Sequence, residues 1–225
     1  MISPRLPSVL VACEFSGVVR DAFARCGHDA WSCDLLPAET PGQHIQGDVR
    51  DILEDGWDLM IAHPPCTHLS RAGARWWKRP ERQQPMRGAV DFVFALRDAP
   101  IHHICIENPI GRLNKEWRYP DQTIQPWQFG HPYSKATCLW LKNLPPLTPT
   151  KVVSEYEALL PSNVGRGRRK GQRSQPGAVH NAKDASRTFL GIATAMAEQW
   201  GECVTAGPAA LRMAEGRPTH TTEAP

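Results

Sequence analysis

The sequence lacks long apolar runs, paired cysteines and a strong charge imbalance. No apolar run among its 225 residues approaches the length that crosses a membrane, and residues 1–7 contain no apolar signal-peptide core. The seven cysteines are odd in number and form no CxxC pair, which argues against a disulfide framework and against a zinc site. The net charge of +3 by itself indicates no class of partner. We therefore expect a cytoplasmic protein with reduced thiols, no bound metal and no membrane contact.

The sequence does have the composition and periodicity of a globular α/β protein. Hydrophobic residues make up 41% of the chain and charged residues 22%, values typical of one domain with a sizeable core. Apolar runs alternate with amphipathic stretches, which predicts strands over 8–12, 30–36 and 58–62 and helices over 18–26 and 50–53. This alternation is typical of a doubly wound, mostly parallel sheet.

The strand predicted over 58–62 stops at two prolines and is followed by a thiol. Pro64 and Pro65 cannot continue the hydrogen-bond ladder of a central strand, so the chain must turn there. Ligands of open α/β sheets bind beyond the carboxyl ends of the strands, which places Cys66 where a nucleophile would lie. Taken alone, Cys66 fits a small buried loop residue better.

Another predicted strand, 101–106, leads directly into Glu107, Asn108 and Pro109. Here too a reactive group and a proline follow an apolar run. If the two strands are parallel neighbours, they direct the Cys66 thiol and the Glu107 carboxyl into one cleft. This pairing of a nucleophile with an acid is the strongest indication of catalysis in the residues themselves.

A turn and two acids indicate a cofactor site near the first strand. The turn Cys13–Gly17 precedes the first helix, whose N-terminal N–H groups suit an anionic or polar cofactor tail. Asp34, at the end of the second strand, is placed to accept hydrogen bonds from a ribose diol. Asp48 is a candidate for the amino group of a base, and a helix cap or a surface charge explains Asp34 equally well. The GxGxxG pattern is missing, which disfavours a dinucleotide.

Two segments rich in basic residues indicate a nucleic-acid partner. Residues 70–88 combine arginine, lysine and tryptophan, including Trp76, and we expect an exposed, mobile loop that contacts nucleic acid. A tryptophan pair packed on the domain is the alternative. Residues 144–185 carry a cluster suited to phosphate contacts, or to a solvated loop. That cluster comprises Arg166, Arg168, Arg169, Lys170 and Arg173.

The chain therefore divides into four predicted parts. Residues 1–143 form the core that carries the catalytic and cofactor residues, and residues 144–185 form a basic insertion. The apolar spacing over 186–200 predicts a helix that closes the core at 186–201. Residues 202–225 are rich in alanine, proline, glycine and threonine, and we expect a tail without fixed structure.

Taken in order, these stretches resemble the DNA (cytosine-5) methyltransferases over about residues 8–200. Residues 64–73, PPCTHLSRAG, look like the family's Pro-Cys-Gln-x-Phe-Ser-x-x-Gly motif, with Thr67 for Gln and Leu69 for Phe. Residues 107–109 resemble its Glu-Asn-Val motif, with proline for valine. Residues 129–137 resemble its Tyr-Gly-x-Pro-Gln-x-Arg-x-Arg stretch. The cofactor loop keeps only the last glycine of Phe-x-Gly-x-Gly-Gly.

The resemblance implies a Rossmann-like methyltransferase fold, S-adenosylmethionine as donor and DNA as substrate. It implies that Cys66 adds to C6 of a flipped cytosine, that Glu107 holds or protonates N3, and that Lys135 replaces the family's first arginine. The implied cofactor contacts are Glu14, Phe15, Ser16, Gly17, Asp34, Leu35, Asp48, Val49 and Pro64. The implied DNA contacts are Pro65, Ser70, Trp76, Asn108, Arg166, Arg168 and Arg169.

The chain departs from the family in the size of its insertion. Only about forty residues, 144–185, stand where the family carries a large target-recognition domain. We expect base specificity to be poor, or to come from the basic insertion, a specificity partner or a second copy of the chain. Two alternatives stay open: an enzyme of the same mechanism with another pyrimidine substrate or a modified donor, and a non-catalytic nucleic-acid-binding relative.

Overall fold

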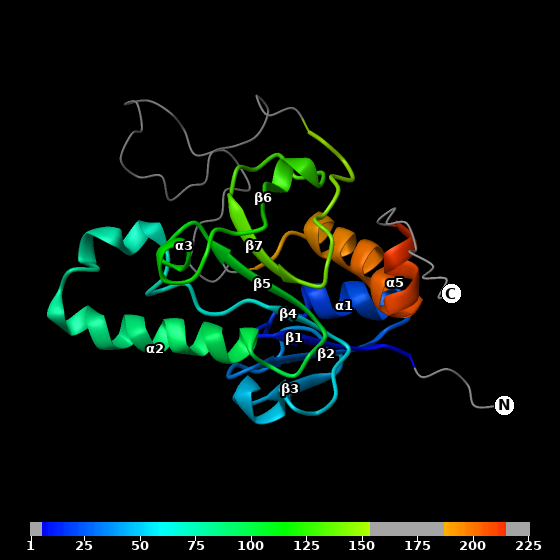
Figure 1. Ribbon diagram of the computed structural model, residues 1–225, viewed down its shortest axis with the longest axis horizontal. Helices are drawn as coiled ribbons and strands as arrows, with labels where there is room; N and C mark the ends of the chain where they lie inside the picture. Colours follow the sequence, from blue (N-terminus) through cyan, green and yellow to red (C-terminus); the bar gives the residue numbers. More distant parts are fainter. Residues whose placement is uncertain (1–5, 154–186, 215–225) are drawn as a thin grey trace, which may run out of the picture.

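The computed structural model describes residues 6–153 and 187–214, with the side chains of the last helix as far as Thr205. Within these residues, seven strands form one sheet in the order β3-β2-β1-β4-β5-β7-β6 (Figure 1). The strands from β3 to β5 are parallel, whereas β7 is antiparallel to both β5 and β6. Their bounds are β1 Ser8–Ala12, β2 Asp29–Asp34, β3 His44–Gln46, β4 Leu59–Ala62, β5 His103–Pro109, β6 Gln122–Ile124 and β7 Thr137–Lys142.

Helices cover both faces of the sheet. α1 and α5 pack against each other on one face, and α2 lies on the other (Figure 1). The helices are α1 Val18–Arg25, α2 Pro80–Arg97, α3 Leu113–Glu116 and α5 Leu190–Ala214, with 3-10 turns η1 Val49–Ile52, η2 Arg71–Trp76 and η3 Pro126–Gln128. In the part of the chain so described, no helix is long and apolar enough to span a membrane.

Strand β1 shows why the sequence produces this layered arrangement. Val9 and Val11 belong to the core shared with α1 and α5, whereas Leu10 and Ala12 belong to the core shared with α2. All four side chains are fully buried. A strand covered on both faces has no polar alternation, so it appears in the sequence as a continuous apolar run. The predicted α/β class with a mostly parallel sheet is confirmed.

The strand order reverses between β1 and β4. From β1 the chain proceeds to β2 and β3 on one side, and from β4 to β5 on the other. In open α/β sheets, the crevice outside the carboxyl ends of the strands at such a reversal is the usual place for a ligand. Residues that directly follow Ala12 and Ala62 therefore border the expected site.

The prediction of a mobile loop over residues 70–88 is wrong, because these residues form η2 and the first half of α2. α2 begins at Pro80, whose fixed φ suits the first position of a helix. Met86, Val90 and Val93 are buried at helical spacing and hold α2 on the sheet. The polar first turns and an internal proline at residue 85 conceal this pattern in the sequence.

The predicted end of the closing helix and the unstructured tail after it are also wrong in part. α5 continues to Ala214, and residues 215–225 lie outside the described residues. Gly201 does not end the helix. A Cβ atom at this position would lie 2.3 Å from Nε2 of His28, so glycine allows α5 to approach the segment after α1.

Several predicted boundaries shift by a few residues. β2 ends at Asp34 rather than at residue 36. The strand predicted over 101–106 is β5, which starts at His103 and includes Glu107, Asn108 and Pro109. The short elements β3, β6 and α3 were not predicted.

Candidate functional site

The Cys66 segment begins where β4 leaves the sheet. All four residues of β4 are buried, and the backbone N–H of His63 still donates to Ala12 O at 2.9 Å. Pro64 is buried, whereas Pro65 and Cys66 are exposed. The turn at the two prolines thus brings Cys66 to the surface at the carboxyl edge of the sheet, as the sequence predicted.

The end of β5 holds this segment in place. The buried Asn108 amide donates to Pro64 O at 2.8 Å, and Leu69 O accepts a 2.7 Å hydrogen bond from the backbone N–H of Arg112. Ser70 forms an isolated antiparallel bridge with Gly111. A Cβ atom on Gly111 would lie only 2.0 Å from Leu69 O, so glycine permits the close approach of the two segments. Asn108, predicted as a DNA contact, here positions the chain ahead of Cys66.

Cys66 lies within electrostatic range of Glu107 and Lys135. Although Cys66 reaches the surface, the protein atoms around its sulfur partly exclude water, which raises the pKa of the thiol. The charge of Glu107 raises this pKa further, and the charge of Lys135 lowers it. Cys66 is therefore a protonated thiol at neutral pH in this state. β4 and β5 are parallel neighbours, with Ala62 beside Ile106, so the thiol that follows β4 and the carboxyl near the end of β5 lie at the same edge of the sheet.

Glu107 pairs with His63, a residue that the sequence analysis did not single out. Nδ1 of His63 lies 3.1 Å from Oε2 of Glu107. Burial raises the pKa of the Glu107 carboxyl. The hydrogen bond from His63, the charge that this ring has only when protonated, and the charge of Lys135 together outweigh burial and leave the pKa below its usual value. Glu107 is thus ionised at neutral pH. The feature of the sequence that could have indicated a functional role for His63 is its position directly after the strand that leads to Cys66.

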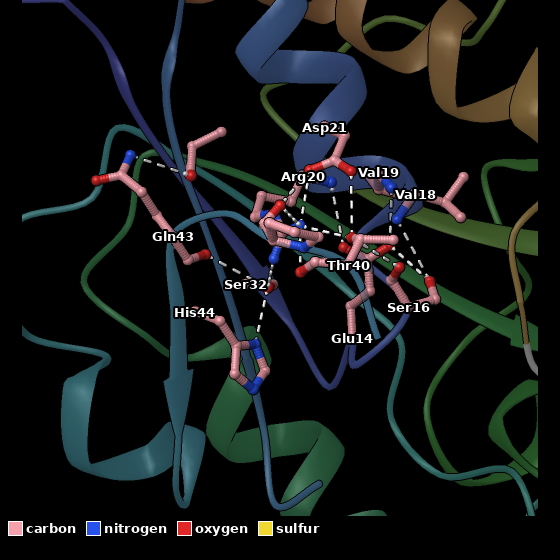
Figure 2. A network of polar contacts seen from close by, with 12 residues as sticks. Glu14, Ser16, Val18, Val19, Arg20, Asp21, Ser32, Thr40, Gln43 and His44 are labelled. Carbon is pink, nitrogen blue, oxygen red and sulfur yellow. Dashed lines mark hydrogen bonds and ion pairs between the residues drawn. The ribbon is translucent and has the colours of Figure 1, made fainter. Parts of the chain in front are cut away.

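Glu14 caps α1, which corrects the predicted cofactor cradle. One carboxylate oxygen accepts hydrogen bonds from the backbone N–H of Val19 at 2.7 Å and from Ser16 Oγ at 3.1 Å, and the other accepts from Arg20 N at 3.1 Å (Figure 2). A carboxylate of the protein itself therefore fills the helix N-terminus. The first-turn N–H groups are not available to a cofactor tail.

Gly17 has a packing role next to this cap. Its φ is +75°, and a Cβ atom there would lie 2.3 Å from Oγ1 of Thr40 and 2.5 Å from the Arg20 guanidinium. Arg20 is fully buried and donates to Thr40, Pro41 O and Ser32 Oγ (Figure 2). This network fastens the segment between β2 and β3 to the start of α1. Close packing thus explains a glycine at position 17 without any cofactor, and the predicted cofactor contact of Gly17 stays a prediction.

A cavity of about 60 Å³ opens at the reversal of strand order. It joins the loop after β1, the first residue after β4, and the segment ahead of α5. Its lining comprises Cys13, Glu14, Phe15, Ser16, His63, Arg187 and Thr188. Three predicted cofactor contacts thus line one cavity, and His63 connects that cavity to Glu107.

The two predicted acids lie near the same edge but have partners within the protein. Asp34 and Asp48 both raise the pKa of the Cys13 thiol, after burial as the main cause, so both lie in its vicinity. Asp34 accepts from the backbone N–H of Leu36 at 2.9 Å. Asp48 caps η1 and pairs with the Arg50 side chain, which lowers the pKa of the carboxyl to about 2.

Two other predicted cofactor residues differ sharply in exposure. Leu35 is 72% exposed at the end of β2, which is unusual for a large apolar side chain and leaves a surface for a ligand. Val49 is 4% exposed and belongs to the core beneath α2. Neighbouring apolar side chains surround the Val49 side chain, and the predicted contact of this residue with a cofactor stays a prediction.

Trp76 lies in η2, six residues after Ser70, whose side chain caps the same turn. The guanidinium groups of Arg79 and Arg75 lie 3.9 and 4.6 Å from the centre of the Trp76 ring. Two guanidinium groups thus pack on Trp76, and that of Arg79 also forms an ion pair with Glu81 at 3.6 Å. The predicted contacts Arg166, Arg168 and Arg169 lie outside the described residues.

Neither a protein-family model nor a curated protein matches this chain. In the described ranges, no group of three or more His, Cys, Asp or Glu residues is arranged to hold a metal ion. The groups that the structure describes at the site are the Cys66 thiol, the Glu107–His63 pair and the cavity that His63 lines.

Proposed function

We propose that the protein transfers a methyl group from S-adenosylmethionine to C5 of a cytosine in DNA, with Cys66 as covalent nucleophile. The observation that carries the proposal is the convergence of Cys66, Glu107 and Lys135 at the carboxyl ends of two adjacent parallel strands. Beside them lies the cavity at the reversal of strand order. The sheet order, with an antiparallel strand added beyond β5, is consistent with the methyltransferase fold that the resemblance implies.

Each of the three side chains has a distinct task. The Cys66 thiolate adds to C6 and thereby makes C5 nucleophilic. Glu107 holds or protonates N3, which withdraws charge from the ring as the thiolate adds. Lys135 stabilises the thiolate, because its positive charge lowers the thiol pKa that burial and Glu107 raise. Loss of the C5 proton and of Cys66 restores the ring and the enzyme.

The cavity fits one end of the donor. A volume of about 60 Å³ is well below the roughly 300 Å³ or more that encloses a whole small ligand. The lining includes the polar side chains of His63 and Thr188, which suit an amino-acid moiety, and the exposed Leu35 offers an apolar surface to the remainder. S-adenosylmethionine bound there would supply an electrophilic methyl group.

Covalent trapping tests the proposal directly. We would incubate the protein and labelled S-adenosylmethionine with DNA that carries 5-fluorocytosine, which has no C5 proton to lose. The expected result is a stable protein–DNA adduct at Cys66 and, with ordinary DNA, label in 5-methylcytosine. Cys66→Ser should give neither, and Cys26→Ser, at an exposed thiol elsewhere, should give both. Donor binding without labelled DNA would instead favour another pyrimidine or another transferred group.

A further inference from the structure

His63 lies between the cavity and the acid of the site. Its side chain is 9% exposed, it lines the cavity, and its Nδ1 lies 3.1 Å from Oε2 of Glu107. Its other ring nitrogen, Nε2, is buried and has no hydrogen-bond partner in the described part of the chain. A buried polar atom without a partner is costly, so a ligand in the cavity that pairs with Nε2 would be favoured.

We propose that His63 couples ligand binding in the cavity to the uptake of a proton by the His63–Glu107 pair. This inference rests on the proposed function, because the ligand concerned is the methyl donor. In the empty site of this proposal, Nδ1–H of His63 donates to the Glu107 carboxylate and Nε2 carries no proton. A carboxylate in the cavity requires a donor, so Nε2 must gain a proton when that ligand pairs with it.

The proton balance permits two arrangements of the loaded pair. In one, both nitrogens of an imidazolium donate, one to the ligand and one to Glu107. In the other, the Nδ1 proton has moved to Glu107, which then donates back to Nδ1. Both hold one more proton than the empty pair. That proton is the one that Glu107 can pass to N3 of the substrate.

The other charged groups around His63 leave this assignment intact. Glu14 also lines the cavity, but its carboxylate oxygens accept from the first turn of α1. Arg187 lines it from the opposite segment and forms an ion pair with Glu39. On the Glu107 side lie Lys135 and Cys66. Burial raises the pKa of the Cys13 thiol, so Cys13 is neutral.

Such coupling explains how an ionised Glu107 serves as an acid only when the donor is present. Protonation of Glu107 also removes the negative charge that raises the pKa of the Cys66 thiol. The thiolate and the acid would then become available together. In the absence of donor, Cys66 would remain a protonated and less reactive thiol.

Calorimetry of S-adenosylhomocysteine binding tests this coupling without turnover. Titrations at pH 8 in buffers of different ionisation enthalpy give the number of protons taken up, which we expect to approach about one per site. His63→Gln, which keeps a polar side chain, should abolish the uptake and flatten the pH dependence of Kd. His102→Gln, at an exposed histidine before β5, should leave both unchanged.

Two results would overturn the inference alone: binding without proton uptake by the unaltered protein, or equal uptake by His63→Gln. In either case, methyl transfer to DNA would still support the proposed function. If S-adenosylhomocysteine does not bind at all, both the inference and the assignment of the donor fail.

Discussion

The side-chain amide of Asn108 donates a 2.8 Å hydrogen bond to the carbonyl oxygen of Pro64. Asn108 belongs to β5, next to Glu107, and Pro64 lies two residues before Cys66. This one bond therefore connects the chain that carries the acid to the chain that carries the nucleophile. It gives the backbone between β4 and η2 a fixed position relative to Glu107.

Asn108→Ala should separate the nucleophile from the acid. The change leaves a buried carbonyl without its partner, so we expect a loss of about 1–3 kcal/mol in the free energy of unfolding and slower adduct formation. Urea unfolding and the rate of covalent trapping are the two measurements. Gln122→Ala removes two 2.7 Å bonds away from the site, since the Gln122 amide donates to Leu147 O and accepts from the backbone N–H of Leu147. This control should lower the free energy of unfolding without slowing the covalent trapping of DNA. If both variants slow trapping equally, Asn108 does not position the nucleophile.

Gly111→Ala should displace the same segment from the other side. An added Cβ would lie 2.0 Å from Leu69 O, so the Ser70–Gly111 bridge must open or shift. We expect a destabilisation of roughly 1–3 kcal/mol, with loss of trapping in the fraction that remains folded.

Gly88→Ala provides the matched control for that change. Gly88 lies within α2, and a Cβ atom there would meet nothing within 4 Å. The substitution should stabilise the protein by roughly 0.5–1 kcal/mol, because alanine is the better helix former, and trapping should not change. A Gly111→Ala protein with full stability and full trapping would refute the close approach.

Alkylation by iodoacetamide should report the charges around Cys66. Burial and Glu107 raise the pKa of this thiol, so at pH 8 its reaction should be slower than that of the exposed Cys26, and it should accelerate as the pH rises above 9. Glu107→Gln should speed the reaction about threefold to tenfold, since the thiolate fraction changes tenfold for each unit of pKa. Lys135→Gln should slow it. Peptide mass spectrometry distinguishes the two cysteines, and no response of Cys66 to either substitution would exclude the proposed electrostatic link.

The sequence predicts the central strands well because burial on both faces leaves an unbroken apolar signal. β1 and β4 carry that signal, and their carboxyl ends locate the thiol and the cofactor loop. The edge strands β3 and β6 are three residues long and largely polar. They form by pairing with a neighbouring strand and have no apolar run that the sequence could show. The first half of α2 was predicted as a loop, because its first turns are polar and contain an internal proline.

Side-chain roles were harder to predict than strand positions. A carboxylate next to a helix start fits a ligand contact and a cap equally well, and only the bonds from Val19 and Arg20 show that Glu14 is the cap. His63 precedes two prolines without any spacing typical of a ligand or catalytic set. Its significance depends on β5 lying beside β4, which brings Glu107 within hydrogen-bond distance.

Replacement of Arg75 and Arg79 by glutamine should weaken DNA binding in a salt-dependent manner. Both guanidinium groups lie against Trp76, and if both contact phosphates, the slope of log K against log salt should fall by about 1.8, since each phosphate contact contributes roughly 0.9. Arg97→Gln is the matched control, because Arg97 also lies over an aromatic ring, that of Phe94 at 4.1 Å, and pairs with Asp98 as Arg79 pairs with Glu81, but it lies at the far end of α2. Fluorescence anisotropy over a range of salt concentrations gives both slopes. If the double variant keeps the slope of the unaltered protein, the η2 surface does not bind the DNA backbone, and phosphate contacts must come from elsewhere in the chain.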